Sequence, residues 1–340
     1  MKASRSNRLG GIGGHLWHAA IAATILGVLP LIAPSASAQT GPYPSRPITL
    51  IVPYGPGSAN DLLARMLAPD LSANLGQNVV VDNKPGAGGS IGTAAIARAR
   101  NDGYTIGISG SATFGVNPNL YTNLPYDARK DFTPLVKLAS TPNVLVVPGQ
   151  SDIKSVPELL ARMKKQQLRY NSLGNGTTQH LAGALLASQA GAVADHLPYR
   201  STGDALTALL SAQVDFAFYA LPAVVNHIKD GRLRALGVTT PTPSAALPDV
   251  PSLSTTGLKD FDKTSVWFGM AAPAGLPDAV TVALHGALEK TLANPAMQAR
   301  LLSSGYVLAP AASQAEFSSF IADQLSFWGQ LIKVSGTKVE

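Results

Sequence analysis

The sequence predicts an α/β fold of about two domains, because short apolar runs alternate with amphipathic stretches along a chain of 340 residues. Six apolar runs have the length and composition of strands, and most of them lead into a helical pattern. They lie at 48–53, 78–83, 104–109, 143–148, 214–220 and 233–239. This alternation favours largely parallel sheets that are covered by helices.

The first 38 residues have the pattern of a secretory signal. The basic residues Lys2, Arg5 and Arg8 precede an apolar stretch at 17–32, and small residues follow it up to Ala38. This arrangement predicts export with cleavage after Ala38. Retention of the stretch as a membrane anchor is the alternative, because spanning a bilayer needs roughly 20 apolar residues. The small-residue site favours cleavage.

Charge and cysteine content exclude several function classes. The formal net charge of +6 falls to +3 when the three basic residues of the predicted signal are removed. That charge is too mild for a nucleic-acid partner, and the densest basic segment, 162–169, is typical of the solvated face of a helix. The chain has no cysteine, so disulfides, thiol chemistry and lipid attachment through an N-terminal cysteine are excluded.

The stretch after the first apolar run has a clear helical period. Leucines recur at every fourth position from Leu63 to Leu75 and form one apolar stripe. Gly76 supplies a stop signal. Pro69 cannot donate a hydrogen bond to the carbonyl of Arg65, so we expect the helix to bend there but not to end.

The loop at 54–61, which reads YGPGSAND, predicts an anion site. Gly55 and Gly57 let backbone amides approach a ligand, and Ser58 or Asn60 can cap the following helix. The start of that helix then presents unpaired N–H groups and a partial positive charge. A carboxylate aimed at such a site would repel an anion, so we expect Asp61 to accept hydrogen bonds from loop amides and to hold the loop's shape.

The same arrangement recurs at 171–191, where Gly174, Gly176, Thr177 and Thr178 precede an amphipathic stretch. A glycine-rich segment at 83–99 also leads into a helical stretch, and a polar loop at 109–119 follows a predicted strand. Several donor-rich loops without a cationic catalyst favour binding of a carboxylate over chemistry on it. Taken alone, each loop is equally typical of an ordinary helix cap. We expect His180 to pack or to donate a hydrogen bond near the pocket, and the positive end of the helix should keep it neutral.

Motifs for cofactors and catalysis are absent from the sequence. The segment GAGGSIG has Ile91 where the dinucleotide fingerprint needs glycine, and no G-x-x-x-x-G-K-[ST] occurs. The histidines have no metal-binding spacing, and GISGS has Ser111 where a nucleophile elbow needs glycine. We therefore expect no cofactor and no metal. An exported enzyme that acts on carboxylates, with His180 beside Ser58 or Thr177, is the alternative from another class.

Several blocks of the chain closely resemble, in order, those of the Bug family. The blocks include YPSRPITLIVPYGPGSANDLLARML, NSLGNGTTQHLAG, LPYRSTGDALTALLSAQVDFAF and WFGMAAPAGLP. This family comprises the TctC-like periplasmic substrate-binding proteins of tripartite tricarboxylate transporters. The resemblance implies capture of a small organic carboxylate and its delivery to membrane permease subunits, with a monomer as the default state. A sensor subunit that presents its closed form to a membrane receptor is a third possibility.

The resemblance also implies a type II periplasmic-binding-protein fold, with two α/β lobes that close about a hinge. The crossings between lobes are expected near 141–147 and 265–272. Domain I would then comprise 43–141 and 266–340, and domain II would comprise 142–265, after a signal peptide at 1–38.

In the family, the loops that match 54–61 and 174–180 come from opposite lobes and hold a ligand carboxylate through backbone amides, hydroxyls and ordered water. The loop patterns and this resemblance together give the candidate ligand-binding residues. They are Tyr54, Gly57, Ser58, Ala59, Asp61, Gly88, Ser109, Ser111, Asn175, Gly176, Thr177, Thr178, His180 and Tyr219.

The chain departs from the family pattern at two places. Family members commonly have Pro-Pro-Gly-Gly before the first helix, where this chain has GPGS ending at Ser58. The first loop is therefore expected to bind the ligand in a different way. Many relatives have Phe-Asp-Asn-Leu-Pro where this chain has FYALP, so Tyr219 and Ala220 replace an acid and an amide. This change removes a partner for an ammonium group and predicts a ligand without positive charge. The alternative is that Tyr219 only packs.

Overall fold

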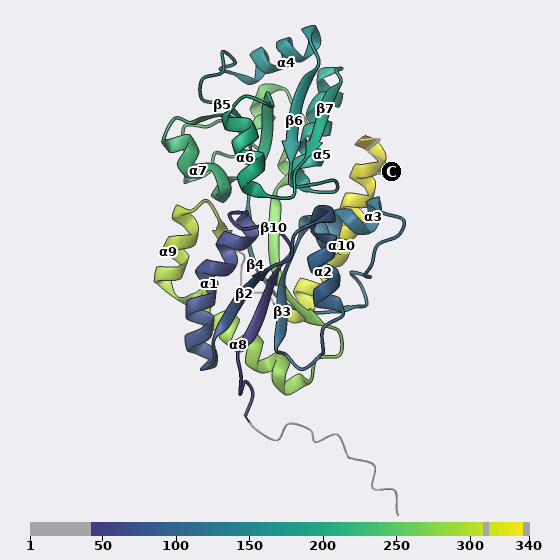
Figure 1. Ribbon diagram of the computed structural model, residues 1–340, viewed down its shortest axis with the longest axis vertical. Coiled ribbons are helices and arrows are strands. Elements are labelled where there is room, and N and C mark those ends of the chain that lie inside the picture. Colours follow the sequence, from purple (N-terminus) through teal and green to yellow (C-terminus); the bar gives the residue numbers. More distant parts are fainter. Residues whose placement is uncertain (1–41, 309–312, 336–340) are drawn as a thin grey trace, which may run out of the picture. The chain divides into compact units, whose positions relative to one another are not determined.

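The computed structural model describes residues 42–308 and 313–335 (Figure 1). The side chains at 263, 334 and 335 are outside this description. The predicted signal peptide and its cleavage site after Ala38 also lie outside the described residues. From Pro42 onward the chain forms one compact unit with two β-sheets. Each sheet and its helices are called a lobe below.

Lobe I contains a six-stranded sheet in the order β11-β4-β10-β3-β1-β2. Its strands are β1 (Ile48–Val52), β2 (Val79–Asn83), β3 (Thr105–Gly110), β4 (Phe132–Thr141), β10 (Val266–Pro273) and β11 (Val307–Leu308). Its helices are α1 (Ala59–Leu75), α2 (Ser90–Ala97), α3 (Asn117–Leu120), α8 (Asp278–Ala293), α9 (Pro295–Ser303) and α10 (Gln314–Ser335). The helices α1, α8 and α9 share a core with one face of the sheet, and α2 and α10 cover the other.

Lobe II contains a five-stranded sheet in the order β7-β6-β8-β5-β9. Its strands are β5 (Asn143–Pro148), β6 (Leu168–Ser172), β7 (Ala194–Pro198), β8 (Phe216–Ala220) and β9 (Leu233–Val238). Its helices are α4 (Val156–Lys165), α5 (Thr178–Ala190), α6 (Thr202–Leu210) and α7 (Leu221–Lys229). The helices α4 and α5 pack on one face and α6 and α7 on the other, so both faces of the sheet are buried.

The prediction of largely parallel sheets is wrong, because both sheets are mixed. The strands β1, β2 and β3 are parallel, as are β6, β7 and β8, but β4, β5, β10 and β11 pair antiparallel with their neighbours. The chain enters lobe II from β4 into β5 and returns through β10. Of the strands that carry the chain between the lobes, β10 in lobe I and β5 in lobe II run against the parallel strands of their sheets. Thr141 of β4 is paired with Val266 of β10, so the outward and return passages lie side by side.

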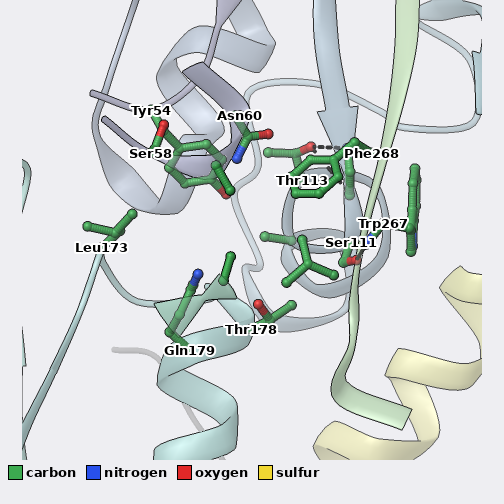
Figure 2. Close-up of a pocket in the computed structure, with 15 residues that line it drawn as sticks. Tyr54, Ser58, Asn60, Ser111, Thr113, Leu173, Thr178, Gln179, Trp267 and Phe268 are labelled. Carbon is green, nitrogen blue, oxygen red and sulfur yellow. Dashed lines mark hydrogen bonds between the residues drawn. The ribbon is translucent and has the colours of Figure 1, made fainter. Parts of the chain in front are cut away.

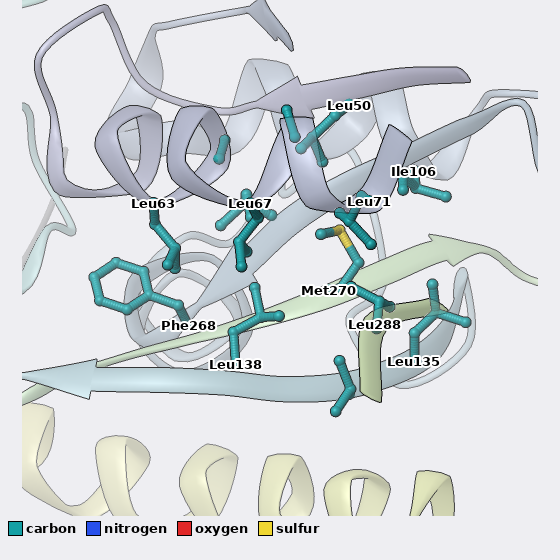
Figure 3. Packing of buried hydrophobic residues seen from close by; sticks show 14 of the residues in the cluster. Leu50, Leu63, Leu67, Leu71, Ile106, Leu135, Leu138, Phe268, Met270 and Leu288 are labelled. Carbon is teal, nitrogen blue, oxygen red and sulfur yellow. The ribbon is translucent and has the colours of Figure 1, made fainter. Parts of the chain in front are cut away.

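The leucine stripe predicted for the first helix lies in the core of lobe I. Leu63, Leu67 and Leu71 of α1 are buried and lie near Phe268 and Met270 of β10 (Figure 3). The helix continues through Pro69 to its left-handed cap at Gly76, which confirms that the proline does not end it. Packing of the stripe thus compensates for the hydrogen bond that the proline cannot donate.

The expected polar loop at 109–119 is instead helical. Ser111–Val116 forms a π-type turn that leads directly into α3. Tertiary contacts hold this turn, because the hydroxyl of Tyr126 donates to the carbonyl of Thr113, and Trp328 of α10 packs on Gly115. Short polar residues favour loops in isolation, but burial against α10 overrides that preference here.

Replacement of Gly269 tests the packing of α10 on lobe I. A Cβ at Gly269 of β10 would overlap the ring of Phe317. Gly269→Ala should therefore lower the free energy of unfolding by about 1–3 kcal/mol through overpacking. The matched control is Gly286→Ala in α8, where the added methyl group meets open space and should raise stability by up to about 1 kcal/mol. Urea unfolding measures both, and equal midpoints would contradict this packing.

Candidate functional site

A cavity of about 30 Å³ lies between the two lobes (Figure 2). Lobe I contributes two segments, lobe II contributes three short segments, and the crossing strand β10 closes one side. The lining residues are Tyr54, Ser58, Ala59, Asn60, Gly110, Ser111, Ala112, Thr113, Leu173, Thr178, Gln179, Ala220, Val266, Trp267 and Phe268.

The start of α1 forms one wall of the cavity. Ser58 caps the helix, and its hydroxyl oxygen accepts a hydrogen bond from the N–H of Asp61 at 3.3 Å. The N–H groups of Ala59 and Asn60, in the first turn, have no acceptor within the helix. Both residues line the cavity. The local sequence S-A-N thus caps the helix and leaves donors beside the space.

The start of α5 forms the opposite wall with the same local arrangement. Thr177 caps this helix by accepting a hydrogen bond from the N–H of His180 at 3.3 Å. Thr178 and Gln179 occupy the first two helical positions and line the cavity. The side chains of Asn60 and Gln179 approach the cavity from opposite lobes (Figure 2). Two helix N-termini therefore present backbone donors and positive dipole ends to one small space.

Hydroxyl groups supply further donors. The oxygen of Ser111 accepts a hydrogen bond from the backbone N–H of Trp267 at 2.8 Å, which leaves its own proton for another acceptor. The hydroxyl oxygen of Thr178 accepts from the side-chain amide of Asn143 at 3.2 Å in the same way. Each hydroxyl is thus oriented by a donor from the protein and can donate into the cavity.

No Asp, Glu, Lys, Arg or His is among the lining residues. Asp61 is buried, but its carboxylate accepts from the N–H of Gly57 and from side chains of Arg65 and Asn83, each at 2.9 Å. It holds the first loop, as expected, and does not line the cavity. Tyr54 lines the cavity as a neutral phenol, because burial raises its pKa, and its hydroxyl donates to the carbonyl of Gly88.

Two stacked histidines support the second loop from behind. The Nδ1 atom of His180 accepts a hydrogen bond from the N–H of Gly176 at 3.4 Å, and its ring lies 4.1 Å from that of His196. The Nε2 atom of His196 lies 2.7 Å from the hydroxyl of Ser172. Burial lowers the pKa of His180 to about 4, and burial together with the neighbouring His180 lowers the pKa of His196 to about 3. Both rings are therefore neutral near pH 7.

Of the candidate residues, the structure brings five together around the cavity: Tyr54, Ser58, Ala59, Ser111 and Thr178. Gly57, Asp61, Thr177 and His180 lie behind the two helix starts and hold their loops. Gly88, Asn175 and Gly176 lie where the lobes touch. Ser109 is buried at the end of β3.

Tyr219 belongs to the core of lobe II and does not line the cavity. Its side chain is 1% exposed, and its hydroxyl donates to the side-chain oxygen of Asn171 at 3.0 Å. The cavity is instead lined by the next residue, Ala220, because successive residues of a strand point to opposite faces. Tyr219 therefore packs inside lobe II, which was the alternative prediction for this residue.

Sequence reasoning missed several lining residues. Asn60 and Gln179 each stand two positions after a capping hydroxyl residue, so the repeated patterns S-A-N and T-T-Q were a signal that could have found them. Trp267 and Phe268 lie on β10, whose pairing with β3 and β4 no local pattern indicates. Thr113 lies on the turn that was expected to be a loop.

The chain at 42–308 and 313–335 lacks both a membrane-spanning helix and a metal-binding cluster. No helix there is long and apolar enough to span a membrane. No cluster of three His, Asp or Glu side chains there could hold a metal ion.

Comparison with protein families gives a match over most of the chain. The model described as "Tripartite tricarboxylate transporter family receptor", TctC, matches residues 63–337. A protein from the tcbD-tcbE intergenic region of Pseudomonas sp. strain P51 is 37% identical over 293 residues, which are 85% of this chain and 86% of that protein. BugT of Bordetella pertussis is 34% identical over 312 residues, which are 91% of this chain and 94% of that protein.

Solved structures share the fold. The periplasmic binding protein BugD is 32% identical with a TM-score of 0.84, over 88% of this chain and all of that chain. An R. palustris protein with adipate is 29% identical with a TM-score of 0.82, over 86% and 98% of the chains. MatC from Rhodopseudomonas palustris with bound malate is 26% identical with a TM-score of 0.81, over 85% and 100%. The predicted two-lobed fold of periplasmic binding proteins is thus confirmed.

The neutral histidine pair predicts that stability falls in acid. An unfolded histidine has a pKa near 6.5, so below that pH the unfolded state binds protons that the folded state excludes. Stability should be complete above about pH 6.5 and should fall towards pH 4, by on the order of 2 kcal/mol for each ring between pH 7 and pH 5. Urea unfolding across this range measures the loss.

His196→Asn should flatten the pH dependence of unfolding, because it removes one of the two groups. The control is His285→Gln on α8, which removes a histidine outside the pair and should leave most of the slope. An unchanged slope in the His196 variant would contradict this assignment.

Proposed function

The chain belongs to the TctC family of tripartite tricarboxylate transporter receptors, and on that basis we propose that it captures a small organic carboxylate between its lobes and delivers it to such a transporter. The observation that carries this proposal is the pair of opposed helix starts at Ser58 and Thr177. They place four first-turn N–H groups, of Ala59, Asn60, Thr178 and Gln179, around one cavity. A carboxylate has two oxygens with about four acceptor positions, so one head group can use this set.

Binding strength would come from charge-assisted hydrogen bonds in a space that excludes bulk water. Hydrogen bonds from neutral donors to an anion are shorter and stronger than those between neutral partners, and low polarity around them strengthens them further. The cavity volume of about 30 Å³ corresponds to about two water molecules, so it suits a head group. A longer ligand would require the lobes to stand further apart than they do here.

The lining also favours a ligand without an amino group. An ammonium group that enters this cavity loses its hydration and finds no carboxylate among the lining residues. Ala220 occupies a lining position where many relatives carry an amide, and Asp61 is already bound to Gly57, Arg65 and Asn83. The two neighbouring structures with named acids support this reading, because neither adipate nor malate carries an amino group.

The finer parts of the proposal follow from the family and the predicted signal. We place the protein in the periplasm, with the signal cleaved after Ala38, and we take it to act as a monomer beside membrane permease subunits. Domain I is taken as 43–141 with 266–340, and domain II as 142–265.

Binding without catalysis is also part of this proposal. The hydroxyl of Thr177 donates to the carbonyl of Gly174 at 2.8 Å, and His180 contacts the N–H of Gly176 instead of a hydroxyl nucleophile.

The charge of the ligand can be tested with matched acids. Isothermal titration with succinate and aspartate compares two dicarboxylic acids of similar shape that differ in an ammonium group. We expect any binding to favour succinate over aspartate by at least about tenfold, which corresponds to 1.4 kcal/mol. A preference for aspartate would refute the ligand class, and chemical turnover of a bound acid would refute binding without catalysis.

The role of Thr178 can be tested by removal of its hydroxyl. Thr178→Val keeps the shape of the side chain but removes one donor to the anion, so the dissociation constant of the best acid should rise by about 10- to 150-fold. Thr49→Val on β1 is the matched control and should leave affinity unchanged, because Thr49 lies on the strand away from the cavity. Equal affinity in both variants would show that the hydroxyl of Thr178 does not bind the ligand.

A further inference from the structure

The lobes touch through a set of glycines that lies beside the cavity. Gly88 belongs to the loop before α2 in lobe I, and Gly174 and Gly176 belong to the loop before α5 in lobe II. A Cβ on Gly88 would overlap the carbonyl oxygen of Asn175. A Cβ on Gly174 would lie 3.1 Å from the backbone nitrogen of Gly88. The two backbones therefore approach as closely as they do because neither loop has a side chain there. We call these three glycines, with Tyr121 and Asn117, the glycine seam.

Side chains at the two ends of α3, Asn117 and Tyr121, complete the glycine seam. The hydroxyl of Tyr121 donates to the carbonyl of Asn175 at 2.9 Å, which is a direct hydrogen bond between lobes. Asn117 is fully buried, and its amide donates to the carbonyl of Gly88 at 3.1 Å and to the hydroxyl of Ser90 at 3.0 Å. A Cβ on Gly176 would overlap the side-chain oxygen of Asn117 and lie 3.1 Å from the Tyr121 ring. The side chains of Asn117 and Tyr121 therefore leave no room for a side chain at Gly176.

The glycine seam adjoins both walls of the cavity without lining it. The carbonyl of Gly88 accepts from the hydroxyl of Tyr54, which lines the cavity. The N–H of Gly176 donates to His180 in the first turn of α5. None of the five seam residues is among the lining residues. A change in the seam therefore alters how the lobes meet while it leaves the donors to the ligand in place.

We propose that the glycine seam stabilises the closed arrangement of the lobes by itself, and that Tyr121 is a positioning residue for ligand binding through this contact. This inference rests on the proposed function of the cavity. If only closed molecules hold the acid firmly, the apparent affinity scales with the fraction of closed protein. The seam then sets the affinity for every acid and the rate of its release. Selection among different acids depends on the lining residues.

The test measures lobe separation in the absence of any acid. Because the natural chain has no cysteine, two exposed positions can be labelled selectively, with Arg129→Cys in lobe I and Lys164→Cys in lobe II. Pulsed electron paramagnetic resonance then gives the distribution of distances between the two spin labels. We expect a population at the closed distance in the otherwise unchanged protein. Tyr121→Phe should lower the ratio of closed to open molecules by about 2- to 10-fold, as expected for the loss of one hydrogen bond.

Gly88→Ala should remove the closed population, because its methyl group would overlap Asn175. Two matched controls separate the seam from general effects. Tyr43→Phe removes a hydrogen bond from a tyrosine hydroxyl to the carbonyl of Gly103 within lobe I. Gly191→Ala adds a methyl group at φ +62°, close to the +59° of Gly88, but it meets open space. Both controls should leave the distance distribution unchanged.

Titration of the same variants with adipate and malate distinguishes the two proposals. If an acid binds, Tyr121→Phe should weaken both acids by the same factor as it lowers the fraction of closed molecules. If neither acid binds but the distances shift as expected, the proposal for the glycine seam is supported and the proposed ligand class is refuted. The seam proposal is overturned if Tyr121→Phe and Gly88→Ala give the original distribution, or if no closed population occurs without acid.

Discussion

The site depends on the N–H groups that an α-helix leaves unpaired in its first turn. Those of α1 and α5 belong to different lobes, and a capping hydroxyl, of Ser58 or Thr177, orders each turn. A single exposed helix start attracts an anion by only about 0.3–1 kcal/mol. Two starts that face one small cavity act on the same charge, and only when the lobes are together. The anion site is therefore complete only in the closed arrangement of the lobes.

Charged and titratable side chains lie around the cavity, but none of them lines it. Asp61 and Arg65 form an ion pair behind the first helix start, and the His180 and His196 rings are kept neutral by burial behind the second. An arginine in the cavity would bind a carboxylate more strongly, but it would also carry a charge that is costly to desolvate when the site is empty. Neutral donors avoid that cost and release an anion more readily, which suits a carrier.

The parts of this arrangement that are local in sequence could be predicted, and the parts made by distant pairing could not. The caps Ser58 and Thr177 and the leucine stripe of α1 follow from patterns within a few residues. The strands β4 and β10 pair with partners far along the chain, so the mixed sheets and the contribution of Trp267 and Phe268 were missed. The turn at 111–116 is helical because α10 covers it. Tyr219 lies outside the cavity because the direction of a side chain depends on strand register.

The pairing of Thr141 with Val266 has a mechanical consequence. Both connections leave lobe I as neighbouring, hydrogen-bonded strands, so the lobes are joined at one narrow hinge. Rotation about it breaks few bonds. Opening and closing about this hinge therefore changes the spacing of the two outer surfaces and, with it, the shape that the molecule presents.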